Sequence, residues 1–403
     1  MRRYSSEGGA RVKANHGFVP YKFQTAGSII AGQNAISELV PRIKMHGDFR
    51  HAVIVTQPSL KAMGVIERIA DELNQAGISS RCVTEVKPEP TVDNIREVYS
   101  NISAEPVDLL IGIGGGSVLD ATKLFSVLLT DPVDVMSLIG TDLVLRPGIP
   151  TVLVPTTSGT GSEVTPNAIV TIPEQELKIG IISRHLLPMM VIIDPVLTVS
   201  LPQAITAATG MDAFTHALES YISNKANPIS DMFALESIRL IAGSLCRAYH
   251  TGSDLEAREN MLLGSMYGGM ALSSAGTAAV HALAYPLGGK FNITHGVANS
   301  MLLPHVMAYN MDAIHDRLGH VARAMGLQDG MEGGNASSEA VIRRIFEWTA
   351  EMRIPQNLRA FGVTEGDVDD LAVAASKVTR LLHNNPKPMD LAAIKSIYRK
   401  LLP

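Results

Sequence analysis

The sequence predicts an α/β domain with a mostly parallel sheet, followed by a domain made only of helices. Up to about Asp194, short apolar runs alternate with amphipathic stretches. Beyond Pro195 the strand-like runs stop, and long stretches rich in Ala, Leu and Met follow. The chain of 403 residues is long enough to form two separate hydrophobic cores. A cleft between two such domains is a common place for a ligand to bind.

The first part alternates strands and helices. The predicted strands are Ala52–Thr56, Cys82–Val86, Leu109–Ile113, Thr151–Pro155, Ala168–Ile172 and Met190–Ile193. Amphipathic stretches such as Lys61–Ala76 and Leu119–Leu129 lie between them. Because strands that alternate with helices form right-handed βαβ units, this order predicts a mostly parallel sheet.

The second part reads as helices throughout. The predicted helices are Gln203–Ser223, Ile229–Tyr249, Asp254–Ser273, Ser338–Glu351 and Asp367–Thr379. We therefore expect a flexible tail over residues 1–20, an α/β domain over 21–195 and an all-α domain over 196–403. The basic start of the tail has no apolar run behind it, so it does not resemble a signal peptide.

Composition excludes several classes of protein. Hydrophobic residues make up 46% and charged residues 18%, which is typical of a compact enzyme rather than a disordered chain. The net charge of −5, with no basic cluster, argues against nucleic acids and anionic membranes as partners. No apolar run approaches the ~18 residues that a membrane-spanning helix needs. Cys82 and Cys246 are the only cysteines, which favours a reducing cytoplasm.

A glycine cluster follows one of the predicted strands. Gly114, Gly115 and Gly116 precede a helix that we expect to begin near Val118. Because glycine has no Cβ, the backbone N–H groups there can approach a pyrophosphate at the positive end of the helix. Ser117 can add a hydroxyl donor or cap the helix. A tight turn between strand and helix explains the glycines equally well.

A second loop favours the phosphate interpretation. Pro155–Glu163 (PTTSGTGSE) is a run of hydroxyls and glycines directly after the strand Thr151–Pro155. Such a run can supply side-chain and backbone donors to a ribose and to phosphates, although a hydroxyl-rich turn looks the same. Two such loops after two strands of one sheet predict a dinucleotide site.

Four residues of the helical part suggest a metal site. Asp212 and His216 are four residues apart and therefore lie on one face of a helix. His281 lies in a helix of small residues, expected over Ser274–Tyr285, and His295 opens the next helix. One carboxylate and three imidazoles suit a single Zn²⁺ or Fe²⁺ ion. Taken singly, Asp212 and His216 are more often structural.

Tyr285 is four residues beyond His281 and shares its face of the helix. Its hydroxyl is therefore expected in the same cleft. Pro286 follows and is expected to bend or end the helix, because proline lacks an N–H group.

With these motifs the chain resembles the iron-containing (group III) alcohol dehydrogenase family, from about Phe23 to the C-terminus. The matching motifs are Gly114–Lys123 (GGGSVLDATK), Pro155–Glu163, Thr209–Glu219 (TGMDAFTHALE), His281–Gly289 (HALAYPLGG), His295–Asn299 (HGVAN) and Asn385–Met389 (NPKPM). The resemblance implies a Rossmann-like N-terminal domain and an all-helical C-terminal domain, the fold shared with dehydroquinate synthases. It also implies a nicotinamide cofactor in the cleft and a homodimer or larger homo-oligomer.

The resemblance assigns roles to particular residues. It implies that Fe²⁺, with Zn²⁺ as a substitute, is held by Asp212, His216, His281 and His295. It implies that NAD or NADP is bound by Gly114, Gly115, Gly116, Ser117, Val118, Asp120, Thr156, Thr157, Thr160, Lys178 and Gln57.

Two positions depart from the family pattern. Tyr285 stands where many members have a histidine that relays a proton to solvent. A tyrosine titrates near ~10 and is a poorer proton relay at neutral pH. Gln57 stands where many NAD-preferring members have an aspartate that binds the adenosine ribose, so NADP remains possible.

The predicted function is metal-assisted hydride transfer between NAD(P) and a small alcohol or aldehyde, in which the cation acts as a Lewis acid. Tyr285 and the four proposed ligands are the candidate catalytic residues. A glycerol dehydrogenase-like polyol oxidoreductase and a hydroxyacid–oxoacid transhydrogenase are alternatives within the same fold. A non-catalytic nucleotide- or metal-sensing module is the alternative of a different class, but the sequence contains no DNA-reading segment.

Overall fold

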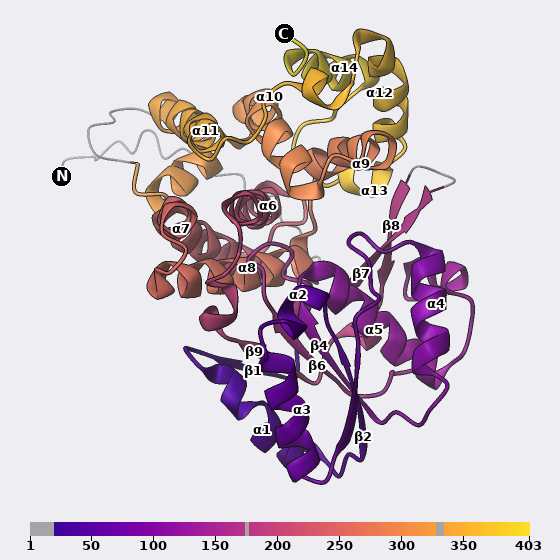
Figure 1. Cartoon of the computed structure of the whole chain (residues 1–403). Helices are drawn as coiled ribbons and strands as arrows, with labels where there is room; N and C mark the ends of the chain where they lie inside the picture. The colour runs from indigo at the N-terminus through magenta and orange to yellow at the C-terminus, as the bar shows by residue number, and fades with distance from the viewer. Residues whose placement is uncertain (1–19, 174–176, 328–333) are drawn as a thin grey trace, which may run out of the picture.

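A computed structural model describes residues 20–173, 177–327 and 334–403. The predicted tail over residues 1–20 therefore lies outside the described residues, apart from Pro20. Two parts follow one another along the chain, a part built on β-sheet and a part built of helices only (Figure 1). The predicted fold class, an α/β part followed by an all-helical part, is confirmed.

The main sheet has six parallel strands in the order β1-β9-β6-β4-β2-β3. Their bounds are β1 Ser28–Ala31, β2 His51–Val55, β3 Ser79–Val83, β4 Leu109–Gly114, β6 Thr151–Pro155 and β9 Met190–Ile193. Since β2, β4 and β6 are neighbours, the segments that follow them lie along one edge of the sheet.

Helices cover both faces of this sheet. Their bounds are α1 Leu39–His46, α2 Pro58–Lys61, α3 Val65–Gln75, α4 Val92–Ile102 and α5 Gly116–Thr130. Alternate residues of β2 enter different cores, since Val53 and Val55 pack with α4 and α5 while Ile54 packs with α1 and α3. Burial on both faces explains why these strands read as continuous apolar runs.

A second, smaller sheet has the order β5-β8-β7, with bounds β5 Gly140–Thr141, β7 Asn167–Ile172 and β8 Leu177–Ile182. The strand predicted at Ala168–Ile172 is β7, and it pairs antiparallel with β8 rather than joining the main sheet. Its residues alternate between buried and half-buried, as expected for a strand with only one covered face. In Figure 1 this hairpin reaches from the sheet part towards α9 and α13.

The helical part contains α6 Gln203–Ile222, α7 Pro228–His250, α8 Leu255–Ala275, α9 Ala279–Phe291, α10 His295–Ala324, α11 Gly334–Glu351, α12 Val368–Ser376, α13 Thr379–Leu382 and α14 Leu391–Lys400. One large core joins them and includes Phe214 and Trp348, whose rings meet edge to face with centroids 5.1 Å apart. Among the described residues, no helix combines the length and the apolar character needed to cross a bilayer.

Two local expectations were wrong. The strand predicted at Cys82–Val86 spans Ser79–Val83 instead. The first three residues of β3 are polar, so they do not form part of an apolar run. The single helix expected over Ser274–Tyr285 is interrupted by Gly276, whose φ of 70° ends α8. Pro286, which was expected to bend or end its helix, lies inside α9, and this helix continues to Phe291.

Candidate active site

Helix α6 carries Asp212 and His216 on one face, as their spacing of four predicts. Both side chains are buried. Helix α10 crosses α6 very closely, since a Cβ on Gly296 would lie 2.2 Å from the carbonyl oxygen of Ala208. Only glycine fits at this crossing, and the close approach brings His295, the first residue of α10, next to Asp212.

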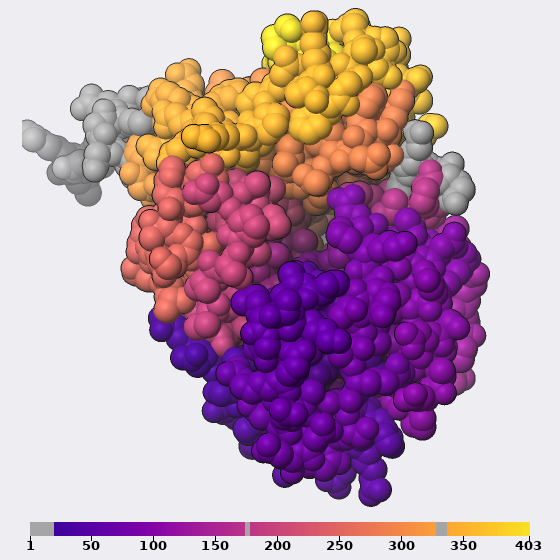
Figure 2. Space-filling model, viewed as in Figure 1, coloured from indigo at the N-terminus to yellow at the C-terminus, as the bar shows by residue number. Residues whose placement is uncertain are grey.

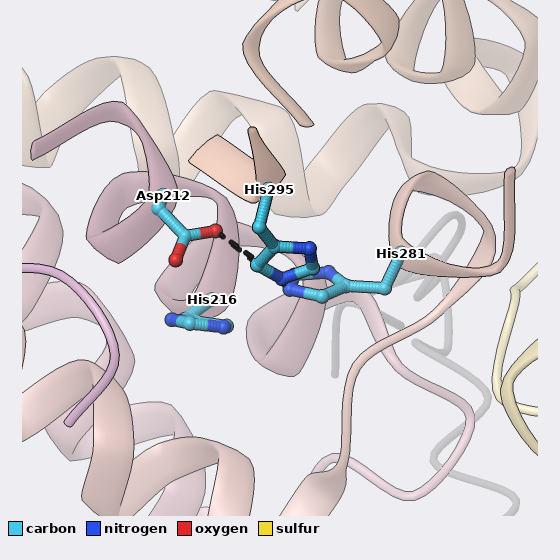
Figure 3. Close-up of side chains that lie close together, drawn as sticks. All are labelled: Asp212, His216, His281 and His295. Carbon is cyan, nitrogen blue, oxygen red and sulfur yellow. Dashed lines mark ion pairs between the residues drawn. The ribbon is translucent and has the colours of Figure 1, made fainter. Parts of the chain in front are cut away.

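The four predicted ligands converge on one point (Figure 3). Each of Asp212, His216, His281 and His295 offers a donor atom, and these atoms all lie within 4.8 Å of one another. The Oδ1 atom of Asp212 is 4.0 Å from Nε2 of His281 and 3.8 Å from Nε2 of His295. The rings of His216 and His281 stack with centroids 4.7 Å apart. We call these four residues the donor cluster.

Two rings of the donor cluster are oriented through their other nitrogen. Nδ1 of His281 lies 2.6 Å from a carboxylate oxygen of Glu219, and Nδ1 of His216 lies 3.2 Å from the carbonyl oxygen of Gly159. Both acceptors require a proton on Nδ1, so Nε2 of each ring carries a lone pair.

Glu219 is fully buried and also accepts hydrogen bonds from the backbone N–H groups of Ala278 and Val280, at 3.0 and 2.6 Å. One carboxylate on α6 thus fixes both the start of α9 and the ring of His281.

Asn299 lies one helical turn after His295 and contacts three members of the cluster. Its Nδ2 atom donates to Oδ1 of Asp212 at 2.7 Å and lies 3.2 Å from Nε2 of both His281 and His295. Its Oδ1 atom is buried and has no hydrogen-bond partner among the described residues. The amide therefore holds the Asp212 carboxylate against the two rings.

The electrostatics of the cluster favour the forms that bind a cation. Burial lowers the pKa of His295 to about 3 and also lowers the pKa of His216. Burial opposes ionisation of Asp212, but the three histidines and Asn299 outweigh it and lower the pKa of this carboxyl. At neutral pH His216 and His295 are thus neutral and Asp212 is a carboxylate, which are the forms in which these groups bind a metal.

The two loops predicted to receive a dinucleotide lie against each other. The N–H group of Thr156 donates to the carbonyl oxygen of Gly114 at 3.0 Å. A Cβ on Gly116 would lie 2.6 Å from the Thr160 side chain, and one on Gly115 would lie 3.4 Å from the side chain of Thr157. We call Gly114–Ser117 together with Pro155–Glu163 the glycine cradle.

Helix α5 begins at Gly116 rather than near Val118, so Ser117 lies in its first turn. The Ser117 hydroxyl accepts from the N–H group of Glu89 at 3.0 Å. The Glu89 carboxylate in turn pairs with Nζ of Lys178 at 2.5 Å. A Cβ on Gly288 of α9 would lie 3.4 Å from Nζ of Lys178, so this lysine joins the sheet part to the helical part.

Two predicted cofactor residues have other partners. The Asp120 carboxylate accepts from the Ser162 hydroxyl and from the N–H group of Ile169, and pairs with Nζ of Lys123 at 2.9 Å. These bonds tie α5 to the cradle and to β7, which indicates a structural role. Gln57, directly before α2, is half-buried and donates to the Ser59 hydroxyl at 3.0 Å.

Tyr285 faces the donor cluster, with its ring centroid 6.0 Å from that of His295. Burial raises the pKa of its hydroxyl, so the phenol stays protonated at neutral pH. This position agrees with the expectation that Tyr285 shares the cleft.

Sequence reasoning missed Glu219, Asn299 and Glu89. Glu219 lies seven residues after Asp212 and Asn299 lies four after His295, so both share a helix face with a proposed ligand. This spacing could have identified both residues as neighbours of the proposed ligands. Glu89 had no such signal, because its partners are distant in sequence.

Comparison with known proteins gives the same picture. The family model for iron-containing alcohol dehydrogenase matches residues 26–195, and the model for the C-terminal part of the Fe-containing alcohol dehydrogenase family matches residues 206–402. The chain is 39% identical to long-chain-alcohol dehydrogenase 1 of Geobacillus thermodenitrificans over 370 residues, which cover 91% of this chain and 93% of the relative.

Two further relatives extend the likeness. Lactaldehyde reductase of Escherichia coli is 36% identical over 373 residues, 91% of this chain and 96% of the relative. A crystal structure of 1,3-propanediol oxidoreductase superposes with a TM-score of 0.91 and 36% identity, covering 95% of this chain and 100% of that one. The chain therefore belongs to the iron-containing alcohol dehydrogenase family and is an oxidoreductase of the alcohol and aldehyde class.

Proposed function

We propose that the protein is a metal-dependent, NAD(P)-linked alcohol dehydrogenase or aldehyde reductase for a small substrate. One observation carries this proposal, the convergence of four donor atoms within 4.8 Å of one another. The glycine cradle is adjacent to the donor cluster, since the carbonyl oxygen of Gly159 lies 3.2 Å from Nδ1 of His216.

The donor cluster suits a divalent cation of the first transition series. Ligand bonds of about 2.1 Å place neighbouring ligand atoms roughly 3–4 Å apart, and the Asp212–histidine distances of 3.8 and 4.0 Å are close to that range. Three imidazoles and one carboxylate are donors that Fe²⁺ and Zn²⁺ both accept. We propose Fe²⁺ as the native ion, with Zn²⁺ as a substitute.

We propose that the glycine cradle binds the dinucleotide. Gly114, Gly115, Gly116, Ser117 and Val118 would face the pyrophosphate at the start of α5. Thr156, Thr157 and Thr160 would line the nicotinamide side, Lys178 would reach a ribose, and Gln57 would meet the adenosine ribose. An uncharged residue at 57 leaves both NAD and NADP as candidates.

The donor cluster would hold a cation that would polarise the carbon–oxygen bond of the substrate, and the glycine cradle would hold a nicotinamide cofactor that would accept or supply the hydride. The protein supplies orientation. Glu219 and Gly159 keep Nε2 of two histidines turned inward, and Asn299 holds the Asp212 carboxylate. The protonated Tyr285 hydroxyl offers a hydrogen-bond donor beside His295, but it is a poor base at neutral pH.

Three properties of the whole protein complete the proposal. We propose that the chain is a homodimer or a larger homo-oligomer, that it works in the cytoplasm, and that its domains are residues 21–195 and 196–403. Light scattering after gel filtration tests the first of these.

The His295→Ala variant tests the function. Protein purified without oxygen and loaded with Fe²⁺ or Zn²⁺ is supplied with alcohols and aldehydes, while the absorbance of reduced NAD and NADP is followed. Bound metal and turnover are expected to fall together in the variant. Stoichiometric metal with unchanged turnover in His295→Ala would refute the assignment.

A further inference from the structure

A pocket of about 360 Å³ lies beside the donor cluster, between the two parts of the molecule. Its walls come from β5 and β8 of the small sheet on one side, and from α9, α12, α13 and the turn between α12 and α13 on the other. Figure 2 shows the surface hollowed where the sheet part and the helical part meet. Apart from Lys178 and Tyr285, none of the residues that line this pocket has a role in the function proposed above.

The pocket has apolar walls and three cationic side chains. Ile179 and Val378 are among the apolar residues, and the cations are Lys178, Lys377 and Arg380. None of the described residues that line the pocket is acidic.

Two of the three cations are available to a ligand. Lys178 is paired with Glu89, so its charge is already balanced. Lys377 and Arg380 are solvent-exposed, and within residues 20–173, 177–327 and 334–403 neither forms an ion pair. The pocket therefore presents two unbalanced positive charges near its opening.

Tyr285 connects the pocket to the reaction centre. It lines the pocket, and its ring centroid is 6.0 Å from that of His295. Lys377 and Arg380 line the same pocket as Tyr285. A molecule with its oxygen at the donor cluster can thus extend past Tyr285 towards Lys377 and Arg380.

We propose that this pocket binds the anionic end of the substrate, so that the protein prefers a short alcohol or aldehyde with a carboxylate, sulfonate or phosphate at its far end. The apolar walls would contact the methylene chain, and Arg380 with Lys377 would pair with the anion. This inference rests on the proposed function, because it assumes that the reacting oxygen binds at the donor cluster.

Matched substrate pairs test the inference. The kcat/KM of the metal-loaded protein is measured with butanal and with 4-oxobutanoate, which have the same chain length and differ in the terminal carboxylate. A second pair, pentanal and 5-oxopentanoate, tests the effect of length. The variants are Arg380→Met, Lys377→Met and their combination, and the matched control is Lys44→Met, an exposed lysine on α1.

The native protein is expected to prefer the anionic aldehyde of at least one pair by about tenfold or more, the size of one charge-assisted hydrogen bond. Arg380→Met is expected to remove most of this preference through KM, to leave the neutral aldehyde unchanged, and to weaken the salt dependence of KM. Lys44→Met is expected to change none of these values. Unchanged turnover of the neutral aldehyde shows that each variant is folded.

Two results would overturn the inference while leaving the proposed function intact. One is equal kcat/KM for the neutral and anionic members of both pairs in the native protein. The other is a preference that survives in the double variant. Absence of turnover with every alcohol and aldehyde would instead contradict the proposed function, and the inference with it.

Discussion

The donor cluster and the glycine cradle are built from opposite kinds of residue. The cluster uses large side chains on three helices, and other groups of the protein hold two of its histidines and its carboxylate in place. The cradle uses glycines and short hydroxyl residues at the ends of strands, where a Cβ on Gly116 would collide with Thr160 of the facing loop. The cluster thus depends on side chains that are held in a fixed orientation, whereas the cradle depends on residues that have no Cβ atom. Damage to one site, if it spares the contact between Gly159 and His216 that joins them, should therefore leave the other intact.

The largest effect that we expect from this comparison is for Gly116→Ala. The added Cβ would lie 2.6 Å from Thr160, so the two loops must separate where the pyrophosphate is proposed to bind. The affinity for NAD or NADP, measured by calorimetry, is expected to fall at least about tenfold. Metal content, measured by mass spectrometry, is expected to stay at the native level. His295→Ala should show the reverse pattern, with metal lost and dinucleotide affinity kept.

Gly243→Ala is the control for the added methyl group. Gly243 is exposed on α7, and a Cβ there would meet no atom within 4 Å. Its substitution is expected to leave both affinities unchanged and to raise helix stability by about 1 kcal/mol or less. Loss of metal in Gly116→Ala, to the extent seen in His295→Ala, would show that the two sites are not independent.

The two sites also differ in how far the sequence predicted them. The cradle follows β4 and β6, whose apolar runs are visible because both faces of the sheet are covered. Asp212 and His216 are four apart, and helical geometry alone places them on one face. The sequence therefore predicted which residues meet, and the structure brings the four donor residues together.

What the sequence did not predict are contacts between distant segments. Glu219 meets the start of α9 about sixty residues later, and no local pattern marks that contact. Strands β1 and β8 were missed, since β1 is short and lies at a sheet edge, and β8 contains Gly180 and pairs antiparallel. Asp120 lies in the Gly114–Lys123 motif, but its carboxylate is bound by Ile169 and Lys123.

An intermediate effect is expected for Glu219→Gln, which tests whether metal binding by the donor cluster depends on the hydrogen bonds that the Glu219 carboxylate accepts. The carboxylate accepts from His281 and from two backbone N–H groups, whereas an amide has one oxygen and would direct an NH₂ group at a donor. Metal affinity is expected to fall about tenfold, the lower end of the range that is typical when the partner of a metal-bound histidine is removed.

The measurement for Glu219→Gln is titration of the metal-free protein with Zn²⁺ against a competing chelator. Dinucleotide affinity serves as the internal control and is expected to remain native. Unchanged Zn²⁺ affinity in a folded variant would mean that His281 is oriented by packing alone.

The smallest effect concerns buried carboxyls, which behave oppositely at the two sites. The pKa of Asp212 is lowered by its partners in the cluster, whereas burial raises the pKa of Glu163, at the end of the cradle, to about 7. The folded protein thus holds a proton on Glu163 between pH 4.5 and about 7 that the unfolded chain has released. Because the folded state binds more protons there, the free energy of unfolding falls as pH rises through this window.

Glu163→Gln removes this titration and keeps the shape of the side chain. Its free energy of unfolding in urea is expected to equal that of the native protein near pH 4.5 and to exceed it at pH 8 by about 3 kcal/mol at most. Asp212→Asn is the matched comparison, and without metal it should show no such gain at pH 8, since the pKa of Asp212 is shifted the other way. An equal gain in the free energy of unfolding at pH 8 in both variants would contradict this prediction. It would mean that burial raises the pKa of Asp212 as it raises the pKa of Glu163.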